Sequence, residues 1–220
     1  MENKIKAFIF DLDGVITDTA KFHYLAWKTL AEELGLEFNQ TDNEELKGVS
    51  RMRSFEIILE KNNGLDKYTE EEKTSYLEKK NEMYIQMIEE IKEEDILPNI
   101  PDFLKEAKKK GLKLAVASAS KNADRVLTLL GIKESFDYIA DAAKIKNAKP
   151  HPEIFLDCVK HLNLQPDECV GFEDSQAGIE AIKEAGMYAV GVAPDIRTVF
   201  PDLMVSSTEE LSVDEIMKKA

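Results

Sequence analysis

Short apolar segments alternate with amphipathic segments over most of this chain. The apolar segments are rich in Val, Ile, Ala and Phe and do not alternate strictly with polar residues, as expected for strands that are buried on both faces. Repeated strand–helix units of this kind predict a parallel sheet with helices on both sides. The predicted strands are Ile5–Asp11, Leu112–Ser118, Phe136–Asp141, Cys169–Glu173 and Tyr188–Val192.

Helix start and stop signals separate these strands. Pro101 stands where a first helical residue is expected, and Gly111 ends the amphipathic segment that follows it. Ser120 can cap a second helix, Pro152 opens a third and Ser175 opens a fourth. Helical sequence therefore lies between successive predicted strands of the core.

The strand–helix pattern stops after the first predicted strand. From about residue 19 to residue 91 the chain holds no convincing strand, and apolar residues such as Tyr76, Met83 and Met87 recur at helical spacing. This predicts a helical insert in an α/β core. We expect a doubly wound, mostly parallel core domain made of residues 1–18 and 89–220, with a helical cap domain at 19–88.

Composition and charge limit the possible partners. The 220 residues are 43% hydrophobic and 33% charged, which suits a soluble globular enzyme, and no apolar run reaches the roughly 18 residues that cross a bilayer. The N-terminal apolar stretch runs into carboxylates without a cleavage site, so we do not expect a signal peptide. The net charge of −14 disfavours nucleic acid as a partner. Cys158 and Cys169 form no CxxC pair, and we expect a cytoplasmic monomer.

The first predicted strand ends in two carboxylates, Asp11 and Asp13, followed by Gly14. Open parallel sheets bind their ligands at the carboxyl ends of strands. Two adjacent anions repel each other unless a cation joins them, and Gly14 allows a sharp turn beside a ligand. A polar turn without any chemistry is the alternative interpretation of this DxD pattern.

A second acidic pair, Glu173 and Asp174, follows another predicted strand. Asp174 or Ser175 could simply cap the next helix. If the two acidic pairs lie on neighbouring strands, however, they place three or four oxygens around one point. Such a site suits a hard cation, and we predict Mg²⁺.

An acidic protein that binds an anionic substrate needs a locally positive site. The hydroxyl of Ser118, at a strand end, and the free N–H groups of the following helix start form a candidate anion site. Lys149 lies in a stiff loop beside Pro150 and could supply the cation, although a lone loop lysine is more often solvated.

The chain thus carries four elements in the order Asp11 and Asp13, Ser118, Lys149, and Glu173 with Asp174. In this order they resemble the haloacid dehalogenase superfamily of aspartyl-phosphate enzymes. The resemblance implies that Asp11 is the nucleophile and Asp13 the general acid–base. It also implies that Ser118 and Lys149 hold the transferring phosphate. The implied Mg²⁺ ligands are Asp11, the backbone carbonyl of Asp13, and Asp174, with Glu173 beside them or in the coordination shell.

Within that superfamily, the insert is similar to that of phosphomutases acting on β-glucose phosphates. This implies isomerisation of β-glucose 1-phosphate to glucose 6-phosphate through β-glucose 1,6-bisphosphate. Arg51 would bind the distal phosphate, and His23 would support Asp13 when the cap closes. A histidine in this context is more often a packed or solvated residue, and a tryptophan is more often packing than a sugar platform, so these alternatives stay open for His23 and Trp27. The residues expected at the sugar phosphate are Trp27, Lys47, Gly48, Val49, Ser50, Arg51 and Lys80 from the insert, and Ser118, Ala119, Ser120, Lys121 and Asn122 from the core.

Two other functions stay open on the sequence alone. A sugar-phosphate phosphatase, of which a hexitol phosphatase is the nearest version, would use the same Asp11 and Asp13. A catalytically silent binding or regulatory module could also have this fold, since fold alone does not establish function. Such a module would be free to lose Asp11, Asp13 or Lys149, and all three are present.

Overall fold

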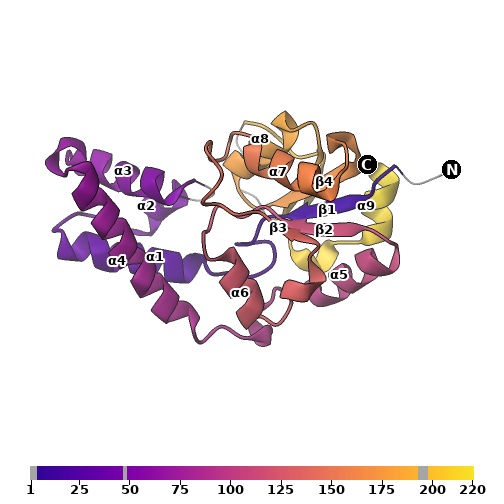
Figure 1. The fold of residues 1–220 in the computed structure, drawn as a ribbon, viewed down its shortest axis with the longest axis horizontal. Coiled ribbons are helices and arrows are strands. Elements are labelled where there is room, and N and C mark those ends of the chain that lie inside the picture. Colours follow the sequence, from indigo (N-terminus) through magenta and orange to yellow (C-terminus); the bar gives the residue numbers. More distant parts are fainter. Residues whose placement is uncertain (1–3, 47–48, 193–197) are drawn as a thin grey trace. The chain divides into compact units, whose positions relative to one another are not determined.

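The computed structural model describes residues 4–46, 49–192 and 198–220. The chain forms two compact units, one made of Met1–Asp18 with Ile91–Ala220 and the other of Thr19–Glu90. In the described residues, the first unit holds the sheet and the second is built of helices (Figure 1). Each unit has its own hydrophobic core.

The sheet of the first unit is parallel throughout its described strands. The strand order is β3-β2-β1-β4-β5-β6, so the first strand lies in the middle and both directions of winding start beside it. In the register, Phe10 of β1 is level with Val116 of β2 and with Phe172 of β4. The strands are β1 Ala7–Phe10, β2 Lys113–Val116, β3 Tyr138–Ile139, β4 Cys169–Glu173, β5 Tyr188–Val192 and β6 Leu203–Val205.

Helices cover both faces of this sheet. Helices α7 and α8 pack on one face and α5 and α9 on the other (Figure 1). The helices of this unit are α5 Ile100–Lys109, α6 Ala123–Leu129, α7 Glu153–Leu162, α8 Gln176–Glu184 and α9 Val213–Lys219. Short 3₁₀ turns lie at Glu93–Asp95, Lys133–Ser135, Pro166–Glu168 and Thr208–Glu210.

The two faces of β1 show why the strand is apolar throughout. Side chains alternate between faces along a strand, and Phe8 and Phe10 both contact the ring of Phe103 on α5. Ala7 and Ile9 belong to the other core cluster, with residues of α7 and α8. All four side chains are fully buried, which holds the carboxyl end of β1 firmly in the centre of the sheet.

The sheet confirms the predicted doubly wound parallel fold. The ranges of β4 and β5 agree with the prediction, whereas β3 is only Tyr138–Ile139, shorter than the predicted strand. Strand β6 was not predicted, because three residues are too few to show a periodicity. Ser120 does not cap α6, which begins after Asn122; its hydroxyl accepts a hydrogen bond from the Asn122 N–H at 3.2 Å.

The segment after β1 forms a tight turn. The Gly14 N–H donates to the Thr17 carbonyl at 2.8 Å, and the Thr17 hydroxyl donates to the Asp95 carbonyl at 2.7 Å. The Leu97 N–H donates to the Ile16 carbonyl at 2.9 Å. The two places where the chain leaves and re-enters the first unit are therefore bonded to each other, beside the DxD turn.

The helical unit packs around one cluster of apolar side chains. Trp27 of α1 stacks on Phe55 of α3 with 6.1 Å between ring centroids. Thr69 and Glu72 form a capping box at the start of α4, which satisfies two backbone N–H groups. The helices are α1 Ala20–Glu33, α2 Gln40–Glu44, α3 Arg51–Lys61 and α4 Glu70–Ile88, with a 3₁₀ turn at Leu65–Lys67.

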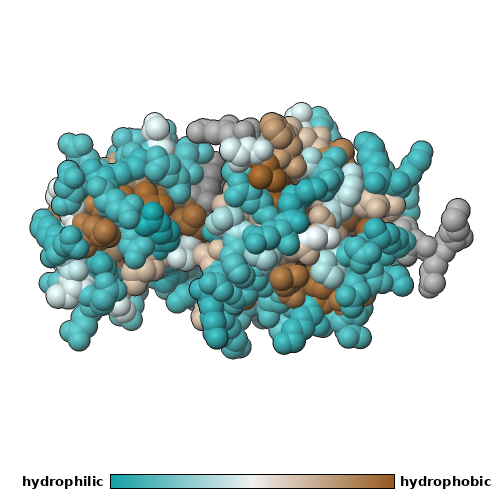
Figure 2. All heavy atoms as spheres, turned by 90° about the horizontal axis from the view of Figure 1, so that it is seen from above, coloured by the Kyte–Doolittle hydropathy of each residue, from teal (hydrophilic) through white to brown (hydrophobic). Residues whose placement is uncertain are grey.

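The surface agrees with the charged composition. Hydrophilic side chains cover most of the face seen in Figure 2, and apolar patches are small and separate. Among the helices of the described residues, none combines the length and the apolarity needed to cross a membrane.

Candidate active site

Three strands bring their polar ends to one edge of the sheet. The Asp11 N–H donates to the Phe172 carbonyl at 2.9 Å, and the Ala117 N–H donates to the Phe10 carbonyl at 2.7 Å. These bonds continue the pairing of β1 with both neighbours beyond its last strand residue. Asp11 therefore lies between the end of β2, which leads to Ser118, and the end of β4, where Glu173 stands.

Lys149 joins two carboxylates at this edge. Its Nζ lies 2.5 Å from Asp11 Oδ1 and 2.6 Å from Glu173 Oε1. It also lies 5.1 Å from the centroid of the Phe155 ring on α7, within the range of a cation–π contact. Asp11, Lys149 and Glu173 are all buried, so the lysine neutralises charge that water does not reach. The Lys149–Pro150 peptide bond is cis.

Burial and charge act against each other on these groups. Burial raises the pKa of Asp11 to about 7, and the carboxylates of Glu173 and Asp13 add to that rise, whereas the Lys149 ammonium opposes it. For Lys149, burial lowers the pKa, but Asp11 and Glu173 outweigh it and the pKa lies above its ordinary value. Lys149 is therefore a permanent cation at neutral pH.

Glu173 has hydrogen-bond partners on both of its oxygens. Oε1 accepts from Lys149, and Oε2 accepts from the Ser175 N–H and hydroxyl, both at 2.8 Å. Its carboxyl group lies against the backbone of Gly178 in the first turn of α8, where a Cβ atom would be 1.8 Å from Glu173 Cδ. In the structure Glu173 orients Lys149, and its role as a metal ligand stays a prediction.

Asp174 lies beside the DxD turn. A Cβ atom placed on Gly14 would be 2.3 Å from Asp174 Oδ2, so the absence of a side chain at Gly14 makes room for this carboxylate. Within the described residues, no three His, Cys, Asp or Glu side chains form a ready metal cluster. The expected donors, carboxylates of Asp11 and Asp174 with the carbonyl of Asp13, are all oxygens, and they suit Mg²⁺ in chemical type.

The segment after β2 forms a turn that is ordered by its own hydroxyls. Ser118 is buried, and its Oγ accepts the Ser120 N–H at 3.1 Å, which leaves the Ser118 hydroxyl proton able to bind an anion. Ala119 and Ser120 are half-buried, Lys121 is exposed and Asn122 is buried just before α6. Of the five residues predicted to contact the sugar phosphate in this segment, Ser118 and Asn122 are thus buried and Lys121 is exposed to solvent.

In the helical unit, Lys80 is enclosed by aromatic rings. Lys80 Nζ lies 2.8 Å from His23 Nδ1, and 4.7 Å and 5.2 Å from the centroids of the Trp27 and Tyr84 rings. Burial lowers the pKa of His23 well below its ordinary value, and the charges of Lys80 and Arg51 lower it further. His23 is therefore neutral, and its Nδ1 accepts a hydrogen bond from the Lys80 ammonium. The proton of the neutral ring then lies on Nε2.

Arg51 begins α3 and contacts α4. Its Nη2 donates to Asn81 Oδ1 at 2.7 Å, and burial lowers the pKa of Arg51. Ser50 caps α3 by accepting the Arg53 N–H at 3.3 Å, and Val49 is half-buried. Two predicted sugar-pocket residues, Lys47 and Gly48, lie outside the described residues.

Two partners in the helical unit were missed by the sequence reasoning. Tyr84 stacks on His23 with 4.0 Å between ring centroids, and its hydroxyl donates to Thr19 Oγ1 at 3.1 Å. Asn81 orients Arg51. Tyr84 follows Lys80 by one helical turn on α4. The sequence signal that could have identified Tyr84 was therefore that it shares a helix face with Lys80. Asn81 gave no signal, because its contact depends on how α3 and α4 pack.

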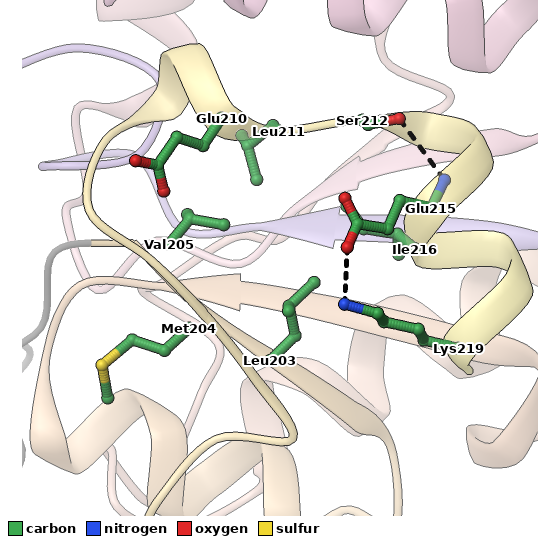
Figure 3. Close-up of a pocket in the computed structure, with 9 residues that line it drawn as sticks. All are labelled: Leu203, Met204, Val205, Glu210, Leu211, Ser212, Glu215, Ile216 and Lys219. Carbon is green, nitrogen blue, oxygen red and sulfur yellow. Dashed lines mark hydrogen bonds and ion pairs between the residues drawn. The ribbon is translucent and has the colours of Figure 1, made fainter.

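A separate cavity lies elsewhere in the sheet-containing unit. It has a volume of about 240 Å³ and lies between β6 and α9, lined by Leu203, Leu211 and Ile216 among others. Figure 3 shows the Glu215–Lys219 ion pair, which lies along α9 among the residues that line the cavity. None of the predicted site residues lines this cavity.

Comparison with known proteins places these features in a family. The family model for haloacid dehalogenase-like hydrolases matches residues 5–186. The chain is 43% identical to the β-phosphoglucomutase of Bacillus subtilis over 96% of this chain and 93% of that protein. It is 30% identical to hexitol phosphatase B of Escherichia coli over 97% of each chain.

A solved structure has the same fold. The crystal structure of β-phosphoglucomutase from Clostridium difficile superimposes with a TM-score of 0.93 at 49% identity, covering 98% of this chain and 96% of that one. The strand-end carboxylates and the buried Lys149 lie within the residues that the family model matches. The chain therefore belongs to the haloacid dehalogenase-like hydrolase family.

Proposed function

We propose that this chain is a phosphomutase that interconverts β-D-glucose 1-phosphate and β-D-glucose 6-phosphate. The reaction would pass through phospho-Asp11 and a β-glucose 1,6-bisphosphate intermediate. The observation that carries the chemistry is the buried contact of Lys149 with Asp11 at the carboxyl end of β1. The likeness to the Bacillus subtilis enzyme supports the choice of substrate.

Asp11 would act as the nucleophile. One of its carboxylate oxygens attacks the phosphorus of the bisphosphate, an O–P bond to Asp11 forms, and the bond from phosphorus to the sugar oxygen breaks. Negative charge on the transferring group is neutralised by the Lys149 ammonium and by the Ser118 hydroxyl. Because these groups are held before the substrate arrives, little reorganisation is needed in the transition state.

Asp13 would move the proton. It protonates the sugar oxygen that leaves, and in the reverse direction it takes the proton from the sugar hydroxyl that attacks phospho-Asp11. Transfer to the alternative hydroxyl of the sugar completes the isomerisation. General acid–base help of this kind contributes typically about 10²–10⁴-fold to a rate.

We propose Mg²⁺ as the cation, held by Asp11, the backbone carbonyl of Asp13, and Asp174. When bound, it would supply positive charge that offsets the charge of the phosphate oxygens and favours the ionised form of Asp11. Burial otherwise holds the pKa of Asp11 at about 7, which is high for a group that must act as an anion.

The helical insert, proposed as a cap at residues 19–88, would recognise the sugar phosphate. Arg51 is proposed to bind the non-transferring phosphate, since Asn81 fixes its guanidinium and a guanidinium matches phosphate geometry. Lys80 is proposed as a further cation for the substrate, and His23 as the residue that supports Asp13. The other expected sugar contacts of the insert, Trp27, Lys47, Gly48, Val49 and Ser50, remain part of the same proposal.

A product analysis tests this function. The purified protein is given β-glucose 1-phosphate, Mg²⁺ and a trace of β-glucose 1,6-bisphosphate, and glucose 6-phosphate and free phosphate are measured together. We expect glucose 6-phosphate without a matching amount of free phosphate, and no product from the α-anomer. Asp11→Asn is the matched control, because the side chain keeps its shape and loses its charge.

A sugar-phosphate phosphatase is the second candidate. The 30% identity to hexitol phosphatase B favours it, and hydrolysis would use the same Asp11, Asp13 and Lys149. The same assay distinguishes the two functions. Free phosphate that equals the substrate consumed, with hexose or hexitol phosphates as substrates and no isomerised product, would identify the phosphatase.

A further inference from the structure

Lys149 reaches Asp11 from an irregular segment of the chain. The residues between β3 and α7 form turns and bends but neither helix nor strand. A lysine side chain has several rotatable bonds, so its position depends on how firmly its backbone is held. What holds this loop in place is therefore part of the mechanism.

Glu153, the first residue of α7, binds this loop through both carboxylate oxygens. Oε1 accepts the Lys146 N–H at 2.8 Å. Oε2 accepts the Asn147 N–H at 2.9 Å and the Asn147 Nδ2–H at 2.7 Å. One carboxylate thus collects three donors from the two residues that lie two and three positions before Lys149.

The loop is also closed on the other side of Lys149. The His151 N–H donates to the Ala148 carbonyl at 3.0 Å, and the Glu153 N–H donates to His151 Nδ1 at 3.2 Å. Phe155, two residues further along α7, places its ring 5.1 Å from Lys149 Nζ. The first turn of α7 therefore contacts the loop before Lys149, the loop after it and the ammonium group itself.

We infer that Glu153 is a positioning residue, which holds the loop so that Lys149 Nζ stays between Asp11 and Glu173. The inference rests on the proposed function, because it assigns Glu153 a role through Lys149. An acidic residue at a helix start can also act only on stability, through the helix dipole. The two roles differ in what a substitution changes: stability alone, or the turnover of a protein that is still folded.

The test compares Glu153→Ala and Glu153→Gln in the full-length, Mg²⁺-loaded protein. Glu168→Ala is the matched control: Glu168 accepts the Gln165 N–H at 2.8 Å but precedes β4, at the opposite end of that strand from Glu173. Three quantities are measured for each variant. They are kcat and KM, the unfolding midpoint, and the amide hydrogen exchange of residues 144–152 by mass spectrometry.

For Glu153→Ala we expect faster exchange in the loop and a kcat about tenfold lower or more, since a misplacement of about 1 Å can cost about 10²-fold. Glu153→Gln keeps one acceptor oxygen and loses the other, so its kcat and loop exchange should lie between those of the wild-type protein and those of Glu153→Ala. Glu168→Ala should leave kcat and loop exchange unchanged. Loop exchange that does not change in Glu153→Ala would overturn the inference, and so would faster exchange with wild-type kcat.

The two proposals fail in different ways. If the wild-type protein makes no glucose 6-phosphate, the mutase proposal is wrong, and the same variants are then compared on release of phosphate from the sugar phosphate. Hydrogen exchange reports on the loop in either case, because it needs no turnover. An unchanged loop in Glu153→Ala rejects the positioning role even if the wild-type protein is an active mutase.

Discussion

Lys149 Nζ lies 2.5 Å from Asp11 Oδ1, although the two residues are 138 positions apart in the chain. Asp11 is 7% exposed and Lys149 3%, so the pair is screened from water on nearly all sides. Charges in such a place are costly unless they are paired. The contact therefore ties the folding of the loop before α7 to the end of β1.

Removing the Lys149 charge should destabilise the protein strongly. In Lys149→Met, Asp11 and Glu173 lose their common cation, and breaking a buried pair in this way typically costs about 3–5 kcal/mol of unfolding free energy. Urea unfolding at pH 7 without metal measures this loss. Because burial raises the pKa of Asp11 to about 7, Asp11 can take up a proton in the variant at pH 5, and the loss should shrink there. A variant within about 0.5 kcal/mol of wild type would show that the pair adds little.

Gly178→Ala should have two opposite effects on stability: a higher helix propensity and a steric clash with Glu173. Alanine is favoured over glycine by about 1 kcal/mol in a helix interior, which is the upper limit in the first turn of α8, so helix propensity alone predicts a gain in stability. The new Cβ would however meet Glu173 Cδ at 1.8 Å. We expect a net loss of about 2 kcal/mol or more and a lower kcat, since Glu173 orients Lys149.

Gly64→Ala is the control for this substitution. Its new Cβ would meet its nearest neighbours at 3.6 Å, an ordinary contact, and its backbone φ of −116° is open to alanine. The change in stability should stay within about 1 kcal/mol. If Gly178→Ala is as mild as Gly64→Ala, the carboxyl group of Glu173 is free to move and does not fix Lys149.

The fold could be predicted largely from the sequence, because buried strands and punctuated helices carry local signals. Strands β4 and β5 have such signals and agree with their predicted ranges, whereas β6 is too short to have one. The strand ends were predicted to carry chemistry and Lys149 to supply a cation there, but the direct hydrogen bonds between these residues were not predicted. That Lys149 bonds both Asp11 and Glu173 depends on the position of β1 between β2 and β4.

Non-local contacts explain what the sequence could not predict about the candidate site. Glu173 was expected beside the metal or in its coordination shell, which stays a prediction. The bonds of its oxygens to Lys149 and Ser175 were not expected. Glu153 has the sequence signal of an ordinary helix start, and only the folded loop shows that it binds Lys146 and Asn147. Side-chain partners across a turn or between helices leave no periodic pattern in the chain.

His23 should stay neutral at pH values at which an ordinary histidine takes up a proton. Burial lowers its pKa, and so do the charges of Lys80 and Arg51. In the unfolded chain His23 takes up a proton near pH 6.5, whereas in the folded protein it stays neutral at that pH. The folded state therefore loses stability as the pH falls through that range, by at most about 1.4 kcal/mol per pH unit.

Nuclear magnetic resonance of the imidazole nitrogens checks this prediction. The chain has only three histidines, so His23→Gln identifies the His23 signals. We expect a proton on Nε2 and an acceptor at Nδ1 from pH 7 down to pH 5.5, and a pH-dependent loss of stability that is smaller in His23→Gln. A titration midpoint of His23 near pH 6.5 would mean that Lys80 does not face Nδ1 in solution.

Gly14→Ala should impair the binding of Mg²⁺. The new Cβ would lie 2.3 Å from Asp174 Oδ2 and push this carboxylate away from the DxD turn. We expect a Mg²⁺ affinity at least about tenfold weaker, a loss of about 1.4 kcal/mol of binding free energy. Isothermal titration calorimetry measures this directly, without substrate.

Gly111→Ala separates this collision from backbone strain. Gly111 has a φ of +79°, close to the +76° of Gly14, and a Cβ there meets nothing within 4 Å. Both variants carry the strain of alanine at positive φ, but only Gly14→Ala reaches Asp174. Equal Mg²⁺ affinities in the two variants would remove Asp174 from the proposed metal site.

The central claim is that Asp11 accepts the phosphoryl group, and trapping the phospho-enzyme tests it most directly. The protein is mixed with β-glucose 1,6-bisphosphate and Mg²⁺, quenched in acid within one turnover, and treated with borohydride, which reduces an acyl phosphate. Peptide mass spectrometry should find the reduced residue at position 11 in the wild-type protein and none there in Asp11→Asn. Continued turnover with position 11 unmodified, or the label on another residue, would contradict the account.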